Sequence, residues 1–335
     1  MALKSTRREF LRQAAAAGAG VAAAGVLGQE VAAAAQPASR SRLVVVRNRS
    51  SISKSDSPGG QVNKAVVAQM LDHAIAKLTG ISDSTAAWKS LFKPDDVVGI
   101  KVNCLFGVGA CTHPEVAHAV ADAVVRAGVK PSNVIIWDRA TGDLLKSGYK
   151  VNRDGPGVRV LANDGVWEEQ PTRQGQFEGR LTKIITEQIT ALINVPVMKD
   201  HSIAGVTAAL KNHYGSFDNP GRHHGNHCDP YLADVNAIPA IRDKTRLVVL
   251  DALRPMADGG PGLRRDSLWD FYSLVLSRDP VAVDYFAWKT IDERRAETGL
   301  KSLAESGREP KWIATAARYG LGTDDPARMD IVRIG

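Results

Sequence analysis

The chain has 335 residues, of which 44% are hydrophobic and only 6% aromatic, and its formal net charge is +7. This length and apolar share support one large globular domain or two smaller ones. The scarcity of aromatic residues, and the lack of any run of five or six like charges, exclude a stacked-base platform and a basic nucleic-acid surface, so nucleic acid is not an expected partner.

The first residues match the twin-arginine export pattern. The pair Arg7 and Arg8 is followed by Phe10 and the basic Arg12, and then by a mildly apolar, alanine-rich stretch with small residues suited to cleavage. An ordinary secretory leader is the alternative, and the apolar run is too short for a membrane anchor. We expect a cleaved signal peptide over residues 1–36, the twin-arginine machinery as a partner, no membrane span afterwards, and a periplasmic or extracellular protein.

Residues 37–335 alternate between strand and helix patterns, which predicts a single α/β domain in one or two lobes. The sheet should be mostly parallel or mixed, flanked by helices and built from βαβ units, the clearest of which spans residues 96–138. The predicted strands lie at 43–46, 96–103, 133–137, 157–162, 192–197, 247–250, 273–276 and 331–334. The predicted helices lie at 63–78, from 114 onward, at 231–241, from 280 onward and at 312–319.

A glycine-bearing loop, Gly107 to Ala110, follows the strand that ends in Lys101 and Asn103. Thr112 and Glu115 have capping-box spacing before the next helix. Unpaired N–H groups at such a helix start would suit a carboxylate or phosphate, but a turn that simply starts a helix is the favoured interpretation. The flanking Cys104 and Cys111 are the cysteines best placed to form a disulfide.

The segment 191–229 holds five of the eight histidines. A strand here should deliver Lys199, Asp200 and His201 at its end, where ligands collect in open α/β sheets. The segment 164–179 lacks a period and predicts a loop or small hairpin. Asp251 is expected to end a later strand, whereas Asp279 before Pro280 has the pattern of a structural helix cap.

Several segments resemble the domain-of-unknown-function family three-six-two. The matching residues are Lys101 with Asn103, His113 with Pro114, NVPVMKDH at 194–201, GVTAALKNHYG at 205–215, Arg222 with His224, Asp251, and SRDPVAVD at 277–284. The resemblance covers most of the chain after the leader. Some members look like iron–sulfur proteins with an added cysteine module, but this sequence has no C-x-x-C, so no iron–sulfur cluster is expected.

A transition metal ion is the candidate cofactor. Imidazole and thiolate groups bind zinc, iron, copper or nickel, and twin-arginine substrates resemble one another in being exported folded, often with a metal or cofactor inserted. The candidate ligands are His213, His223, His224, His227 and Cys228. The glycines among them argue instead for a loop whose histidines bond the backbone or face solvent, and this interpretation is weighed slightly above the metal site, which remains open.

Three lysines, at or after predicted strand ends, form the second candidate site. With neighbouring polar residues they suit a small anionic substrate, although solvated surface lysines are the alternative for any one of them. The candidate catalytic residues are Lys101, Asn103, Lys199, His201, Lys211, Asn212 and Asp251, with Asp138 beside them.

The functional hypothesis is an exported enzyme that acts on a small anionic or polyhydroxylated molecule by acid–base chemistry, with or without a metal. Oxidoreduction, isomerisation and hydrolysis stay open as reaction types. The alternative is a non-catalytic exported protein that binds an anion or a metal.

Overall fold

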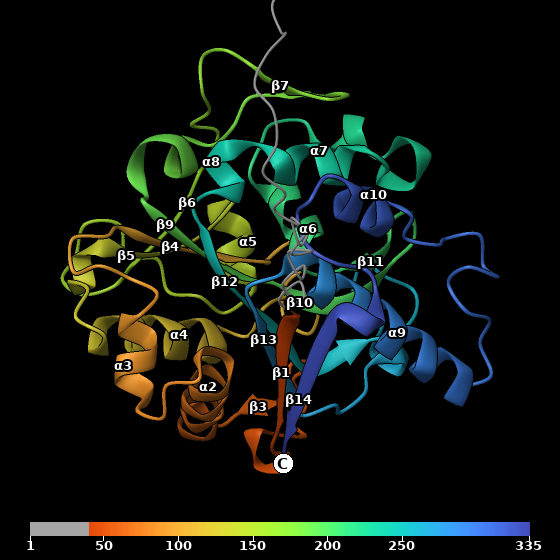
Figure 1. Ribbon diagram of the computed structural model, residues 1–335, viewed down its shortest axis with the longest axis horizontal. Helices are drawn as coiled ribbons and strands as arrows, with labels where there is room; N and C mark the ends of the chain where they lie inside the picture. Colours follow the sequence, from red (N-terminus) through yellow and green to blue (C-terminus); the bar gives the residue numbers. More distant parts are fainter. Residues whose placement is uncertain (1–39) are drawn as a thin grey trace, which may run out of the picture. The chain divides into compact units, whose positions relative to one another are not determined.

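A mixed β-sheet organises the part of the chain that the structure describes, residues 40–335 (Figure 1). The structure is a computed structural model, and it confirms the predicted α/β fold class. The strands that cross the sheet are, in spatial order, β14 (Met329–Ile334), β1 (Ser41–Arg47), β13 (Ser273–Ser277), β12 (Thr245–Met256), β9 (Ala191–Val195), β4 (Val98–Val102), β5 (Val134–Asp138) and β6 (Arg159–Ala162). A hairpin of β10 (Val197–His201) and β11 (Gly205–Thr207) joins this sheet through β12. The predicted leader lies outside the described residues.

The sheet is parallel on one side of β12 and mixed on the other. β12, β9, β4, β5 and β6 run parallel, and α4 (Pro114–Arg126) links β4 to β5 as the predicted βαβ unit. β13 is antiparallel to both β12 and β1, while β14 pairs parallel with β1. Parallel strands present their carboxyl ends at one edge, so β4, β5 and β9 bring their terminal residues together.

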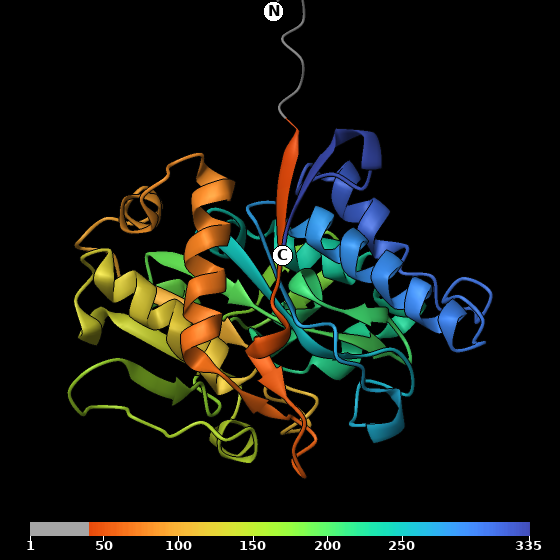
Figure 2. The ribbon, with the colours of Figure 1, turned by 90° about the horizontal axis from the view of Figure 1, so that it is seen from below.

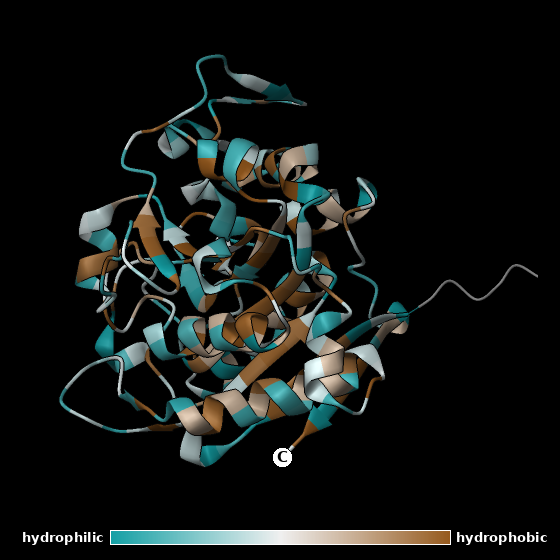
Figure 3. Cartoon of the chain, turned by 90° about the vertical axis from the view of Figure 1, so that its left-hand side faces the viewer, coloured by the Kyte–Doolittle hydropathy of each residue, from teal (hydrophilic) through white to brown (hydrophobic). Residues whose placement is uncertain are grey.

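Helices cover both faces of the sheet (Figure 2). The first face carries α2 (Lys64–Thr79), α3 (Ser84–Lys89), α4 and α5 (Thr141–Lys146). The second carries α6 (Ala209–Asn212), α7 (Tyr231–Ala237), α8 (Pro239–Arg242), α9 (Pro280–Glu297) and α10 (Trp312–Arg318). Side chains alternate along β1, with Val44 and Val46 in the first core and Leu43 and Val45 in the second. The buried strands therefore contribute hydrophobic residues to both cores, and Figure 3 shows central strands largely in the brown of hydrophobic residues.

Two small hairpins complete the strands. β2 (Ile52–Ser53) pairs with β3 (Gln61–Val62), and β7 (Thr172–Gln174) pairs with β8 (Phe177–Gly179), where a loop or hairpin was predicted. In residues 40–335, no helix combines the length and apolarity needed to cross a membrane.

The start of α4 differs from the predicted capping box. Its N-cap is His113, which makes no side-chain cap bond. The Thr112 hydroxyl instead donates to the carbonyl of Val195 at 2.7 Å and accepts from the backbone N–H of Asn103 at 3.0 Å. Thr112 thus ties β4 to β9. The predicted cap at Asp279 is confirmed, because its carboxylate accepts from the backbone N–H of Ala282.

Three predicted boundaries were wrong. Pro196 interrupts the chain after β9, so Lys199 and His201 lie within a separate strand, β10. β12 continues five residues beyond Asp251, because β10 pairs with this second half of the strand. The predicted helix 231–241 divides into α7 and α8 at Pro239, whose missing N–H cannot continue the helix.

Candidate functional site

Most of the polar residues predicted after the strands line one cavity of about 640 Å³. Its walls come from the carboxyl ends of β4 and β5, the β10–β11 hairpin, α6 and the short 3-10 helix Pro220–His223. Six of the seven candidate catalytic residues line it: Lys101, Asn103, Lys199, His201, Lys211 and Asn212. Asp138 and His224 line it as well. We call it the lysine cavity.

Lys101 is buried and fully paired. Its side chain is 1% exposed, and its Nζ donates to Asp138 Oδ1 at 2.8 Å, to the Val102 carbonyl at 2.6 Å and to Asn212 Oδ1 at 3.3 Å. An ammonium group has three N–H donors, so these acceptors use all of them. Asp138 Oδ2 in turn accepts from the backbone N–H of Cys104 at 2.6 Å. Lys101 therefore holds the ends of β4 and β5 together and has no donor left for a ligand.

Gly215 makes this pairing possible. A Cβ at this position would lie 2.8 Å from Lys101 Nζ and 2.9 Å from Asp138 Oδ1. A larger residue at position 215 would displace the ion pair. Glycine is therefore needed here, because only a residue without a side chain lets the backbone lie so close to the pair.

Lys199 and Lys211 are buried without a carboxylate partner among residues 40–335. Lys199 is 2% exposed, and its Nζ donates to the Ala110 carbonyl at 2.6 Å. Lys211 is 7% exposed, with its Nζ 3.3 Å from His224 Nε2 and 3.7 Å from the centre of the Tyr214 ring. Burial lowers the pKa of Lys199 to about 8 and that of Lys211 to about 7. Each keeps donors free for a ligand.

The two histidines of the lysine cavity have defined tautomers. His201 Nδ1 accepts from the backbone N–H groups of Ile203 and Ala204, both at 3.1 Å, so the proton of the neutral ring lies on Nε2. Burial, together with Lys211, lowers the pKa of His201 to about 2, so the ring stays neutral. His224 Nδ1 donates to the Pro220 carbonyl at 2.9 Å, which leaves Nε2 as the acceptor facing Lys211.

Two further polar atoms on the cavity wall lack a hydrogen-bond partner in the described part of the chain. These are the Thr207 hydroxyl, on a side chain only 3% exposed, and Asn103 Oδ1. An unpaired buried polar atom carries a desolvation cost that a bound ligand can remove. Thr207 was not predicted as a site residue, and the register of the β10–β11 hairpin explains its place in the cavity, because Thr207 lies opposite Lys199.

Asp251 lies outside the lysine cavity. Its Oδ2 accepts from both the backbone N–H and the Nδ1 of His113, at 2.8 and 2.7 Å, while His113 Nε2 faces the Gly59 carbonyl at 2.9 Å. Both ring nitrogens therefore face acceptors and must donate. Although burial opposes the charge, the Asp251 carboxylate raises the pKa of His113. This buried pair fixes the start of α4 to the middle of β12.

The five candidate metal ligands are dispersed. His213 lines a separate cavity of about 100 Å³ and bonds Ser216 Oγ at 3.0 Å, and burial lowers its pKa to about 3. His223 packs against the rings of Phe217 and Tyr231. His227 is exposed, Cys228 is buried, and only His224 lines the lysine cavity.

This dispersal does not fit a metal centre. Within residues 40–335, no group of three or more His, Cys, Asp or Glu side chains is arranged to hold a metal ion. Cys104 and Cys111 are, like Cys228, buried free thiols.

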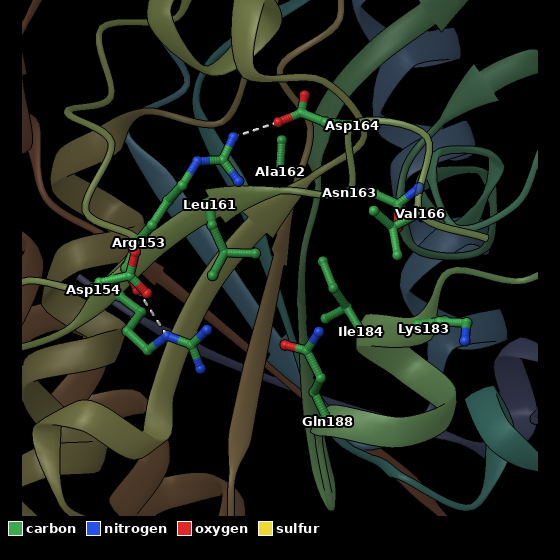
Figure 4. Close-up of a pocket in the computed structure, with 11 residues that line it drawn as sticks. Arg153, Asp154, Leu161, Ala162, Asn163, Asp164, Val166, Lys183, Ile184 and Gln188 are labelled. Atoms are coloured by element: carbon green, nitrogen blue, oxygen red, sulfur yellow. Dashed lines mark hydrogen bonds and ion pairs between the residues drawn. The ribbon is translucent and has the colours of Figure 1, made fainter. Parts of the chain in front are cut away.

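A second hollow of about 250 Å³ lies beside β6 (Figure 4). Arg153 reaches across it to Asp164, and Arg159 Nε donates to the Arg153 carbonyl at 3.2 Å. Lys183, also on its wall, pairs with Glu187 at 3.2 Å. These charged side chains are partly exposed and already paired, so their charges need no bound ligand to compensate them. The lysine cavity is therefore the stronger candidate site.

The fold and the cavity define an α/β protein with a buried cationic site. The family model described as Domain of unknown function (DUF362) matches residues 98–289, more than half of the chain. The chain belongs to this family, as the sequence resemblance predicted. The matched range contains Lys101, Lys199 and Lys211.

Two further comparisons add less. No curated protein matches the chain. A protein from Thermotoga maritima with a solved crystal structure is similar at 11% identity and a TM-score of 0.38, over 71% of this chain. The match covers 60% of that protein's length.

Proposed function

We propose that this protein is an exported enzyme that binds a small organic anion on Lys199 and Lys211 and moves a proton through Lys211. One observation carries the proposal: two buried lysines, without carboxylate partners in the described residues 40–335, face the same cavity. Burying an unpaired charge is costly, and a bound anion offsets that cost. The unpaired Thr207 hydroxyl is a further hydrogen-bond donor to the same ligand.

Lys211 is suited to acid–base work because burial lowers its pKa to about 7. Near neutral pH it is present both as an amine, which takes a proton, and as an ammonium group, which returns one. His224 Nε2 accepts from it and so orients the Nζ group. His201 remains neutral and supplies an Nε2–H donor rather than a mobile proton. Such a proton transfer serves isomerisation and hydrolysis alike.

The test measures the exchange of carbon-bound protons of the acid with deuterium from the solvent. The protein without its leader is incubated in D₂O with a panel of small 2-oxo and 2-hydroxy carboxylates, and loss of C–H signals is followed by proton NMR. We expect exchange with at least one acid, its loss in Lys211→Met, and its retention in His213→Ala, whose ring lies outside the lysine cavity.

The alternative is a non-catalytic anion-binding protein, which the two free ammonium groups would also serve. Calorimetry on the same panel separates the two proposals. Stoichiometric binding that Lys199→Met abolishes, without exchange or product, would favour the binding protein.

The export proposal rests on the twin-arginine pattern at the start of the sequence. Cell fractionation of a strain carrying the full chain should place the protein in the periplasm or medium. Replacing Arg7 and Arg8 with lysine should retain it in the cytoplasm.

A further inference from the structure

The mouth of the lysine cavity is apolar, in contrast to its cationic floor. Leu105, Phe106 and Ile203 line it and are 54%, 48% and 40% exposed, while Pro261 completes the wall. Large hydrophobic side chains gathered at the entrance of a polar cavity are typical of a surface that a ligand covers.

The apolar mouth and the buried charge are adjacent. Lys199 Nζ lies 5.4 Å from the centre of the Phe106 ring. A ligand whose acid group contacts Lys199 is therefore within reach of that ring with its neighbouring atoms. A chain of hydroxyl groups at this position would meet apolar surface and lose its hydrogen bonds to water.

Phe106 is held in place by its backbone. Its φ of 83° lies in the left-handed region, which bulky residues rarely adopt. The loop around it is fixed by the bonds Gly107 N–H to Cys104 O at 3.1 Å and Val108 N–H to Lys146 O at 3.3 Å. A strained conformation that the surrounding bonds maintain at a cavity mouth indicates a functional position for this side chain.

We infer that the ligand is an amphiphilic organic anion, with an acid group on Lys199 and Lys211 and an apolar group, the size of one or two rings, between Phe106 and Ile203. The inference rests on the proposed anion site and narrows the expected substrate class from anionic or polyhydroxylated molecules to aromatic or aliphatic acids. A volume of about 640 Å³ accommodates such a molecule.

The experiment compares two carboxylates of opposite character, 2-naphthoate and gluconate, by isothermal titration calorimetry on the protein without its leader. We expect 2-naphthoate to bind at least about tenfold more tightly, since tenfold corresponds to the burial of about two methylene groups. Phe106→Ala and Ile203→Ser should each weaken 2-naphthoate about fivefold and leave gluconate unchanged. Lys211→Met should weaken both.

The matched control is Leu300→Ser, which removes a comparably exposed hydrophobic side chain, 39% exposed, away from the cavity. Phe106→Leu keeps an apolar side chain but removes the aromatic ring beside the Lys199 ammonium group. It therefore separates the apolar contact with the ligand from the contact between the ring and that ammonium group. Thermal unfolding verifies that each variant is folded.

The outcomes distinguish the two proposals. Equal or tighter binding of gluconate, with no effect of Phe106→Ala and Ile203→Ser, would overturn the amphiphilic class and leave the anion site intact. Failure of both acids to bind would overturn the anion site and this inference together.

Discussion

The lysine cavity contains two kinds of buried lysine: one whose N–H donors are all used by protein acceptors, and one that keeps donors free. This difference separates a structural role from the proposed ligand-binding role. Lys101 spends its three donors on protein acceptors, including the Asp138 carboxylate. Lys199 and Lys211 are buried almost as deeply, yet each has a single hydrogen-bond contact within the described residues. Removing one partner of a compensated buried pair is strongly destabilising, whereas an uncompensated buried charge already carries a desolvation cost that a bound anion would offset. Pairing, rather than burial, distinguishes the lysine assigned to the fold from the two lysines proposed to bind a ligand.

The largest expected effect is on the paired lysine. Lys101→Met leaves the Asp138 carboxylate buried without its cation, which should lower the free energy of unfolding by about 3–5 kcal/mol. Urea unfolding measures this loss, and Lys101→Met combined with Asp138→Asn should recover part of it. Lys211→Met is the matched control and should lose little or gain. Equal losses in Lys101→Met and Lys211→Met would break the distinction.

The pH dependence of stability sharpens the comparison. The pKa of Lys211 is about 7 in the fold and 10.5 in the unfolded chain, so above pH 7 the unfolded state binds more protons. The contribution of Lys211 to the free energy of unfolding is therefore lowest below pH 7 and rises toward pH 10.5. The difference between wild type and Lys211→Met should change by as much as about 1.4 kcal/mol per pH unit between pH 7 and 9.

Urea unfolding at several pH values measures this slope. Parallel pH curves for the two proteins would show that Lys211 is not a buried, uncompensated amine.

The Thr207→Val variant tests whether the wall of the cavity that carries unpaired polar groups binds a ligand. Thr207→Val removes an unpaired buried hydroxyl without changing the side-chain shape, so stability should stay level or rise by about 1 kcal/mol. Affinity for the bound acid should fall about fivefold. Thermal unfolding and calorimetry measure the two effects. A loss of stability without a change in affinity would assign Thr207 to the fold.

The smallest effect is expected at His213, which sequence analysis grouped with the metal candidates. His213→Ala should change the affinity for the acid by less than about twofold, because the ring faces a different cavity. Calorimetry measures it, and a large loss would show that the two cavities communicate.

The sequence predicted most of the sheet and the convergence of the lysines, because both depend on local patterns. Apolar strands ending in polar residues place Lys101 and Asp138 at one sheet edge, and the βαβ rule makes them neighbours. The break at Pro196 and the extension of β12 were missed, because they depend on how β10 pairs with β12. Strand pairing over such distances has no local sequence signal.

The histidine-rich segment shows the opposite case, a conspicuous pattern that the fold disperses. Asn219, Asn226 and His227 adopt left-handed φ values of 47°, 47° and 54°. Each such residue turns the chain sharply, so neighbouring side chains point into different surroundings. Asn and Asp tolerate this conformation, but their presence does not say which residue adopts it. Composition alone therefore suggested a ligand set that the backbone separates.

The position of β1 has a consequence for the order of synthesis. Leu43, near the start of the described residues, lies beside both Ser277 of β13 and Ile331 of β14. β1 therefore has no partner until β13, which ends at Ser277, has been synthesised, and its second partner follows only with β14 at Met329–Ile334. Loss of β14 would move the open edge of the sheet from β14 to β1, whose buried hydrophobic residues Leu43–Val46 would then lie on the edge strand.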